Sequence, residues 1–270
     1  MGVIKNLKHL QASYEGCEAC ELKCHRNKVV FGRGNPKHPM LMCIGEAPGR
    51  AEDQSGLPWE GDAGKTFWGL LRKSSIDKDD VYCTNMVMCR PKGNRDPTAA
   101  EMRACRSRLE QQIQIIRPNA LLLVGRIALN LLGYGVGGVA ANRGVIHEVE
   151  LDGGIWYAVS TYHPSYLNRT QSGDIQDAMV QDMHLAWSAA EIVSQYRSEY
   201  ASNPNQACFR ELNSKSKTAI AESTQARGAA LEGHGSARRS EAESRRKDHD
   251  TREDSRGRKK LRLDRRQSVD

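Results

Sequence analysis

The 270-residue sequence has no apolar run approaching the roughly 18 residues that a membrane-spanning helix requires. Its first residues, MGVIKNLKHLQASYEG, also lack the apolar core of a signal peptide. Met-Gly at the start is compatible with myristoylation, but Asn6 stands where that motif needs Ser or Thr. We therefore expect a soluble, intracellular (cytoplasmic or similar) protein with no membrane partner.

Residues 205–270 contain no Trp or Tyr and a single Phe, Phe209. They hold 17 Lys and Arg against 11 Asp and Glu, so this segment carries +6 of the chain's formal charge of +7. Such a segment cannot bury enough apolar surface to offset the entropy of ordering. We expect a folded domain over residues 1–204, followed by a disordered, basic, mixed-charge tail. The tail either contacts nucleic acid or another polyanion, or is solvated without a partner.

A disulfide framework is not expected, because the eight cysteines occur in a chain without a secretory signal. Cys17 and Cys20 form a C-x-x-C pair, whereas Cys89 falls in an expected loop and Cys105 on the helix that follows it. Four thiolates suit a 4Fe-4S cluster or a structural zinc ion, and the long gap between the last two favours iron and sulfur. Cys24 is the reserve ligand.

Short apolar runs alternate with helical patterns along the first 204 residues. The expected strands are Leu41–Ile44, Asp80–Thr84, Ala120–Val124 and the hairpin of Val145–Leu151 with Ile155–Thr161. The expected helices are Ile4–Tyr14, Ala63–Ser74, a segment from the capping box of Thr98 and Glu101 to Pro118, Ile127–Leu132 and Asp174–Tyr200. This alternation predicts an α/β fold with a mostly parallel sheet, in which Cys43 and Cys83 are small buried side chains.

Polar loops follow three of these strands. Glu46 and Trp59 lie in the loop after the first strand, Asn85 ends the second, and His163 follows the last. Ligands of open α/β sheets bind beyond the carboxyl ends of the strands, so these residues are candidates for one site. A loop of this composition is by itself more often an ordinary connection, and only the combination favours a site.

The segment HPSYLNR, which begins at His163, has a second possible role. Ser165 can cap a helix or bind phosphate, and Arg169 is a further phosphate-binding group. Tyr166 and Leu167 are apolar side chains that we expect on an exposed loop. An apolar tip between phosphate-binding groups is typical of a wedge that enters a nucleic-acid duplex.

With these motifs in order, the sequence resembles the family 4 uracil-DNA glycosylases, the iron–sulfur type of the uracil-DNA glycosylase superfamily. The resemblance spans about residues 10–200. It rests on GEAPG-x-x-ED at 45–53, G-x-P-aromatic-x-G-x-AG at 56–64, VY-x-TN-x-V-x-CRP at 81–91, NR-x-P at 94–97, HPSYL-x-R at 163–169 and the spaced cysteines.

The resemblance implies a three-layer α/β/α sandwich around a central, mostly parallel, four-stranded sheet. It also implies a monofunctional DNA-repair enzyme that flips uracil out of DNA and hydrolyses its N-glycosidic bond, leaving an abasic site.

The resemblance implies roles for individual residues. Asn85 would read the edge of uracil and Trp59 would stack on the base, while His163 would donate a hydrogen bond to the leaving base. Glu46 would balance positive charge on the sugar or orient the attacking water. The other implied residues are Gly45, Ala47, Glu52 and Asp53 for the pocket; Arg90, Lys92, Arg95, Ser165, Tyr166, Leu167 and Arg169 for DNA; and Cys17, Cys20, Cys89 and Cys105 for a structural 4Fe-4S cluster.

Two positions depart from the family pattern. Trp59 stands where Phe is usual, which could narrow the pocket or change its tolerance for other deaminated bases. Ala47 stands where another branch has a water-activating aspartate, so the residue that activates water stays open. The alternatives are the same scaffold acting on other deaminated bases or binding uracil-DNA without turnover, and a zinc-stabilised nucleic-acid-binding module without catalysis. We expect a monomer that acts on single- or double-stranded DNA.

Overall fold

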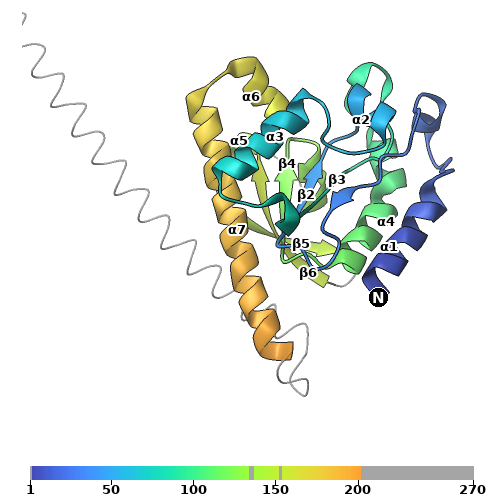
Figure 1. The fold of residues 1–270 in the computed structure, drawn as a ribbon. Coiled ribbons are helices and arrows are strands. Elements are labelled where there is room, and N and C mark those ends of the chain that lie inside the picture. Colours follow the sequence, from blue (N-terminus) through green and yellow to red (C-terminus); the bar gives the residue numbers. More distant parts are fainter. Residues whose placement is uncertain (1, 134–136, 152–153, 202–270) are drawn as a thin grey trace, which may run out of the picture. The chain divides into compact units, whose positions relative to one another are not determined.

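The computed structural model describes residues 2–133, 137–151 and 154–201 (Figure 1). One mixed sheet with six strands forms the centre of this part, in the order β1-β3-β2-β4-β6-β5. The strands are β1 (Arg33–Gly34), β2 (Leu41–Gly45), β3 (Val81–Asn85), β4 (Ala120–Val124), β5 (Ile146–Leu151) and β6 (Gly154–Thr161). The predicted tail at 205–270 and the centre of the predicted hairpin turn lie outside the described residues.

The four inner strands of the sheet are parallel, as predicted. β3, β2, β4 and β6 run in one direction, whereas β1 and β5 pair antiparallel with their neighbours at the two edges. The sheet has six strands instead of the four expected, because the first arm of the hairpin joins it as β5 and the two residues of β1 add the other edge. The mostly parallel α/β fold is therefore confirmed.

Helices cover both faces of the sheet (Figure 1). α3 (Asp62–Lys73) and α7 (Gly173–Ala201) pack on one face, and α4 (Ala99–Ile116) with the 3-10 helix η4 (Ala128–Leu132) packs on the other. α1 (Gly2–Tyr14) lies against the outer side of α4. These three layers are the expected α/β/α sandwich. No helix in the described part of the chain is both long and apolar enough to cross a bilayer.

The pattern of β2 shows why these layers form. Leu41 and Cys43 belong to the core beneath α3 and α7, whereas Met42 and Ile44 belong to the core beneath α4. Successive side chains of a strand point to opposite faces, so a strand that is apolar throughout must be covered on both. Cys83 is fully buried in the neighbouring strand, like Cys43, as predicted.

Short helices line the edge of the sheet where the parallel strands end. They are α2 (Arg50–Ser55), α5 (Gly138–Asn142) and α6 (Pro164–Thr170), with a 3-10 turn at Lys92–Asn94; further 3-10 turns lie at Glu21–Cys24 and, before β3, at Lys78–Asp80. We expected loops where α2 and α6 form. α2 ends at Gly56, whose φ of 85° suits a glycine C-cap, and α6 begins at Pro164, where a fixed φ favours the first helical turn.

Helix α4 begins with the predicted capping box. Thr98 Oγ1 accepts from the Glu101 N–H at 3.2 Å, and Glu101 Oε2 accepts from the Thr98 N–H at 2.7 Å. Arg95 donates two further hydrogen bonds to this carboxylate, at 2.6 and 2.9 Å. These hydrogen bonds, Arg95 first, lower the pKa of Glu101 from its ordinary 4.5 to about 2.

We predict that Glu101→Gln lowers the free energy of unfolding at neutral pH. A carboxyl group whose pKa is depressed by folding stabilises the fold above its unfolded pKa, and this contribution disappears as the pH falls through its folded pKa. The deficit of the variant should therefore shrink between pH 4.5 and about pH 2. Urea unfolding across this range measures it, with Glu110→Gln on the same helix as the control. A deficit that is independent of pH would contradict the prediction.

Candidate active site

The carboxyl ends of the four parallel strands meet at one cleft of about 930 Å³. Glu46 follows β2, Asn85 ends β3, Gly125 follows β4 and His163 follows β6, and all of them line this cleft. Trp59 lines it as well. The sheet thus brings together the four candidates that the sequence places in three separate loops, as the strand-end rule predicts.

Asn85 lines the cleft, whereas Gly45, also predicted for the pocket, lies opposite it at the end of the neighbouring strand and does not itself line the cleft. A Cβ on Gly45 would lie 2.5 Å from Asn85 Oδ1 and 2.8 Å from Trp59 Cζ2, so only glycine leaves room for both side chains. Asn85 is 6% exposed. Among the described residues, no hydrogen bond engages its side-chain amide, whose donor and acceptor are therefore available to a ligand.

The indole of Trp59 forms an apolar wall of the cleft. It stacks on Phe67, with 4.2 Å between ring centroids, and lies nearly parallel to the His163 ring at 6.0 Å. Its backbone is held closely: Trp68 Nε1 donates to the Trp59 carbonyl at 3.1 Å, and a Cβ on Gly64 would lie 2.1 Å from that oxygen. The glycine at position 64 of the motif is thus required by this close approach.

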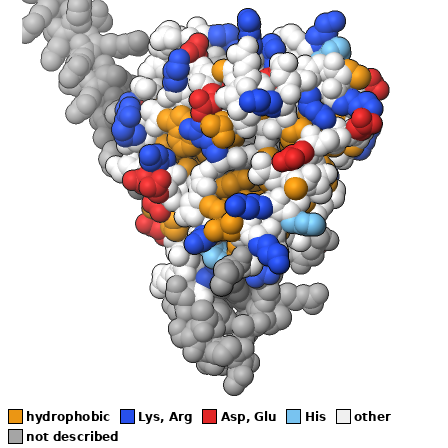
Figure 2. Space-filling model, turned by 45° about the vertical axis from the view of Figure 1, so that its right-hand side comes forward, with side chains coloured by type: hydrophobic (Ala, Val, Ile, Leu, Met, Phe, Trp, Pro, Cys, Tyr) orange, Lys and Arg blue, Asp and Glu red, His pale blue; other side chains and the backbone are white. Residues whose placement is uncertain are grey.

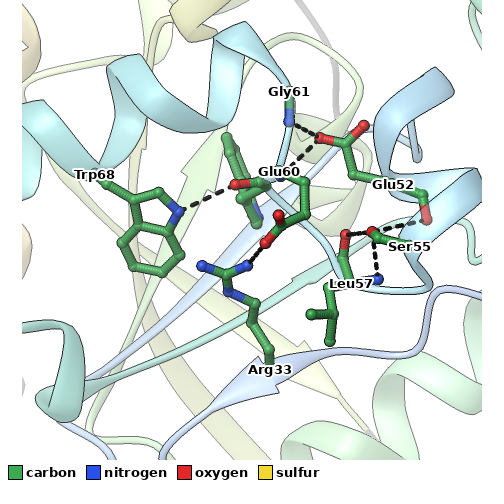
Figure 3. A network of polar contacts seen from close by, with 8 residues as sticks. Arg33, Glu52, Ser55, Leu57, Glu60, Gly61 and Trp68 are labelled. Atoms are coloured by element: carbon green, nitrogen blue, oxygen red, sulfur yellow. Dashed lines mark hydrogen bonds and ion pairs between the residues drawn. The ribbon is translucent and has the colours of Figure 1, made fainter.

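Figure 3 shows the polar contacts that fix the loop around Trp59. Glu52 Oε1 accepts from the backbone N–H groups of Glu60 and Gly61, both at 2.9 Å. Arg33 on β1 forms an ion pair with Glu60, and its guanidinium lies 4.8 Å from the centroid of the Trp68 ring. Glu52, a predicted pocket residue, therefore lines the cleft while one of its carboxylate oxygens holds this loop.

Asp53 does not line the cleft, which corrects its prediction as a pocket residue. It is fully buried on α2. Its carboxylate accepts from the backbone N–H and the side-chain amide of Asn27, the former at 2.8 Å, and from the Lys28 N–H at 3.4 Å. Asp53 therefore joins α2 to the segment that follows the N-terminal cysteines, because those donors satisfy both of its oxygens.

His163 caps helix α6 with its own side chain. Its Nδ1 accepts from the Ser165 N–H at 3.2 Å and lies 3.0 Å from Ser165 Oγ. A backbone N–H can only donate, so the proton of the neutral ring is on Nε2. Burial, followed by the charge of Arg169, lowers the pKa of His163 from 6.5 to about 4, against an opposing effect of Glu52. At neutral pH the cleft therefore contains a neutral imidazole with Nε2–H as its donor.

Glu46 lies beside a second carboxyl group, that of Asp96. Burial, then the charge of Asp96 and a hydrogen bond with it, raise the pKa of Glu46 from 4.5 to about 7, while Arg126 opposes the shift. Asp96 in turn forms an ion pair with Arg126. Two close carboxyl groups cannot both ionise freely, so Glu46 is partly protonated near neutral pH.

Sequence reasoning missed Asp96 and Arg126 as cleft residues. Asp96 falls inside the NR-x-P motif at 94–97, where it occupies the variable position. Arg126 directly follows β4, so the rule about strand ends could have found it. Ala47 and Ser165 line the cleft as well.

The segment after His163 presents Tyr166 and not Leu167. Tyr166 is 39% exposed on α6, and its ring lies 5.4 Å from that of Tyr162. Leu167 is 8% exposed and packs into the core beneath α3 and α7. The expectation of two exposed apolar side chains is therefore wrong for Leu167, because the helix turns it inward.

Four arginines line the cleft: Arg50, Arg95, Arg126 and Arg169. Glu101 and Asp96 engage two of them, whereas Arg50 and Arg169 form no ion pair with any residue that the structure describes. Arg90 and Lys92 lie on the adjoining loop, outside the lining of the cleft. In Figure 2, several Lys and Arg side chains gather along the upper edge of the molecule, where α2 lies in Figure 1.

The cysteines predicted as ligands lie near one another. Cys89 and Cys105 are buried in a cluster with Leu10 and Leu22, against which Cys20 packs. Burial raises the pKa of the Cys89 thiol to about 11, with smaller contributions of the same sign from Cys105 and Cys20. Burial likewise raises the pKa of Cys20, and Cys105 and Cys17 add to this shift. Cys20, Cys89 and Cys105 are therefore electrostatic neighbours, and Cys17 is a neighbour of Cys20.

Two arginines interact with these thiols, Arg26 with Cys89 and Arg108 with Cys105. Arg26 Nη1 donates to Cys89 Sγ at 3.4 Å, and it opposes the rise in the pKa of that thiol. Cys24 is exposed. Across residues 2–133, 137–151 and 154–201, no three His, Cys, Asp or Glu side chains converge as a metal-binding group.

Comparisons with known proteins agree with this geometry. A model of the uracil DNA glycosylase superfamily matches residues 31–187, which include the whole lining of the cleft. The chain is 38% identical over 173 residues to a type-4 uracil-DNA glycosylase of Thermotoga maritima, covering 64% of this chain and 88% of that protein. A type-4 enzyme of Archaeoglobus fulgidus is 35% identical over 166 residues, with 60% and 83% covered. A type-5 enzyme of Pyrobaculum aerophilum is 32% identical over 147 residues, with 47% and 62% covered. Since the family model matches more than half of the chain, including the lining of the cleft, and both type-4 relatives are at least 35% identical, the chain belongs to the uracil-DNA glycosylase superfamily, within its family 4.

Proposed function

We propose that this protein is a monofunctional uracil-DNA glycosylase that starts base excision repair. It binds uracil-containing DNA, takes the flipped base into the cleft and hydrolyses the bond between the base and deoxyribose, leaving an abasic site. The observation that carries this proposal is the convergence of the Asn85 amide, the Trp59 ring and the neutral His163 imidazole in one cleft. The proposed active form is a monomer.

Asn85 supplies the recognition of uracil. Its amide offers a donor and an acceptor, which match the carbonyl at position 4 of uracil and the N–H at position 3. Cytosine presents the opposite order on this edge, so its binding would leave buried polar groups unpaired, at a cost of about 1–3 kcal/mol each. Trp59 provides the ring against which the base stacks.

His163 and Glu46 act on the bond that breaks. The electron pair of the glycosidic bond stays with the base, and its negative charge spreads to the carbonyl oxygen at position 2. The Nε2–H of His163 donates a hydrogen bond to this oxygen. The sugar becomes positively charged until water adds to its anomeric carbon and loses a proton. The ionised form of Glu46 stabilises that positive charge and accepts the proton from water. Asp96 beside it contributes to the raised pKa of Glu46 and so to the balance between the protonated and ionised forms.

The remaining candidates hold the DNA. Arg90, Lys92, Arg95, Ser165 and Arg169 contact phosphates, and Arg50 at the cleft adds to them. Tyr166 is the exposed ring that enters the base stack when the nucleotide leaves it.

We predict that His163→Ala and Asn85→Ala impair uracil excision in different ways. Removing a donor to a developing anion typically costs about 10²–10³ in rate, so His163→Ala should lower the single-turnover rate by that factor while leaving affinity for uracil-DNA almost unchanged. Asn85→Ala should weaken uracil binding and relax the discrimination against cytosine. Single-turnover kinetics and binding to labelled oligonucleotides measure both effects.

The control for this pair is His184→Ala, which changes a histidine on α7 that does not line the cleft. It should excise uracil at the wild-type rate. A near-normal single-turnover rate for His163→Ala would contradict the assigned role of the imidazole.

The four neighbouring cysteines support a structural 4Fe-4S cluster as part of this proposal. Cys17, Cys20, Cys89 and Cys105 would hold it, because Cys20, Cys89 and Cys105 are electrostatic neighbours, Cys17 adjoins Cys20, and Arg26 beside Cys89 suits an anionic thiolate site. Metal binding and local folding are coupled in such sites, so the thiols need not converge beforehand. The group would supply stability, by joining the N-terminal segment to α4 and to the loop that carries Arg90 and Lys92.

We predict that Cys89→Ser and Cys105→Ser lose iron and lower the melting temperature, because each removes a ligand. Cys24→Ser is the matched control and should keep its iron, since Cys24 is exposed and is not part of the buried cluster of Cys89 and Cys105. Iron and sulfide analysis with visible absorbance measures loading. Normal iron in Cys89→Ser would show that the ligand set is wrong, and zinc without sulfide in the wild type would favour the zinc alternative.

The tail is proposed to strengthen DNA binding through its net charge of +6. Truncation after about Pro204 should leave the single-turnover rate unchanged and weaken DNA binding, mainly at low salt, where phosphate contacts contribute most. A series of binding measurements at increasing salt tests this. Equal affinities of the two proteins throughout the series would contradict a role for the tail.

A further inference from the structure

Arg108 on α4 is buried completely, with 0% of its surface exposed. Its Nη1 donates to Gln112 Oε1 at 2.6 Å and to Thr84 Oγ1 at 3.2 Å. Its Nη2 donates to two successive backbone carbonyls, those of Asn85 at 2.9 Å and Met86 at 3.0 Å. No carboxylate of the described residues forms an ion pair with this guanidinium.

Stability alone does not account for such a residue. Moving a charged group out of water without an ionic partner is costly, and apolar side chains of similar volume often replace buried charges without loss of stability. The contacts of Arg108 are therefore better explained by what they fix. They fix the backbone at the point where β3 ends and Asn85 enters the cleft.

The turn after Asn85 is held from two sides. On one side, the N–H groups of Met86 and Val87 donate to the carbonyls of Gly45 and Glu46, at 2.9 and 3.3 Å. On the other side, Arg108 binds the carbonyls of Asn85 and Met86. Both peptide edges of the turn are thus occupied, so its backbone has little freedom to rotate the amide of Asn85 out of place.

The direction of the guanidinium is itself fixed by a buried network. Gln112, whose Oε1 accepts from Arg108, donates through Nε2 to the Phe31 carbonyl at 3.1 Å and to Tyr82 Oη at 3.3 Å. Thr84 Oγ1 donates to the same Phe31 carbonyl at 2.8 Å. Arg108 Nε has no hydrogen-bond partner among the described residues, so the contacts of Nη1 with Thr84 and Gln112 are the side-chain contacts that orient the guanidinium.

Helix α4 also carries Cys105, one turn before Arg108. The same rigid helix therefore reaches the cysteine cluster through one side chain and the end of β3 through another. Any displacement of α4 moves the donors that hold Asn85.

We propose that Arg108 is a positioning residue for uracil recognition, which holds the Asn85 amide in its reading position and connects it to the cysteine-bearing helix. This inference rests on the proposed role of Asn85 in reading uracil. Arg108 also interacts with the Cys105 thiol, and it acts on recognition through the backbone of Asn85 and Met86.

The test compares Arg108→Met and Arg108→Lys with Arg197→Met. Arg197 on α7 is a matched control, because it also donates to backbone carbonyls, those of Arg117 at 2.8 Å and Pro118 at 3.1 Å, but does not line the cleft. Binding of uracil-DNA, discrimination against cytosine, single-turnover rates and melting temperatures are measured for each variant.

Arg108→Met is expected to lower kcat/KM for uracil-DNA by about 10²-fold, the effect of a catalytic-site displacement near 1 Å, and to relax discrimination against cytosine. Arg108→Lys should show a smaller loss of the same kind, since an ammonium keeps the charge but not the fork. Arg197→Met should lower only the melting temperature.

Wild-type discrimination by a folded Arg108→Lys or Arg108→Met variant would overturn the proposal, as would an equal loss in Arg197→Met. Failure of both Arg108 variants to fold would make this residue a determinant of stability only, and would overturn it too. Asn85→Ala separates the two levels of inference: normal discrimination by that variant would reject the reading role of Asn85 itself. Relaxed discrimination in Asn85→Ala with none in the Arg108 variants would reject only the positioning role.

Discussion

The absence of a side chain at Gly45 is the constraint on which the cleft depends. Asn85 Oδ1 and Trp59 Cζ2 both lie where a Cβ of residue 45 would be, so β2 and β3 can end side by side and still leave space for an amide and an indole. The parallel pairing of these strands fixes the register of Gly45 opposite Asn85. The space for the Asn85 amide and the Trp59 indole is therefore built into the backbone of the sheet.

The electrostatics of the site follow from where charge develops. In the proposed reaction, breaking the glycosidic bond creates negative charge on the base and positive charge on the sugar, and we assign the neutral His163 donor to the first charge and the Glu46 carboxyl to the second. Helix α6 makes the donor possible, because the Ser165 N–H occupies Nδ1 of His163 and leaves the proton on Nε2. Asp96 contributes to the raised pKa of Glu46, and Arg126 opposes that rise. Asp96 and Arg126 also form an ion pair with each other.

The sequence was sufficient for the parts that follow from local pattern. The apolar runs of β2, β3 and β4 predict a buried parallel sheet, and the rule about strand ends then brings Asn85 and His163 together. The sequence was not sufficient to predict side-chain positions that depend on tertiary contacts. The helical phase that buries Leu167 and exposes Tyr166 depends on a cap made by a histidine side chain, and the commitment of Asp53 to Asn27 depends on a segment distant in the chain. In the sequence, Arg108 cannot be distinguished from the other arginines of its amphipathic helix. Only the fold shows that it binds the backbone carbonyl of Asn85.

The most direct test of this account is the protonation state of His163, measured by ¹⁵N NMR of the imidazole ring in the folded protein, with His163→Asn to assign its signals. The account predicts a neutral ring with its proton on Nε2 from about pH 5 to 8, and a positive charge only near pH 4. A ring that is already charged at about pH 6, or a neutral ring with its proton on Nδ1, would contradict the claim that His163 is neutral before the reaction and donates from Nε2 to the leaving base.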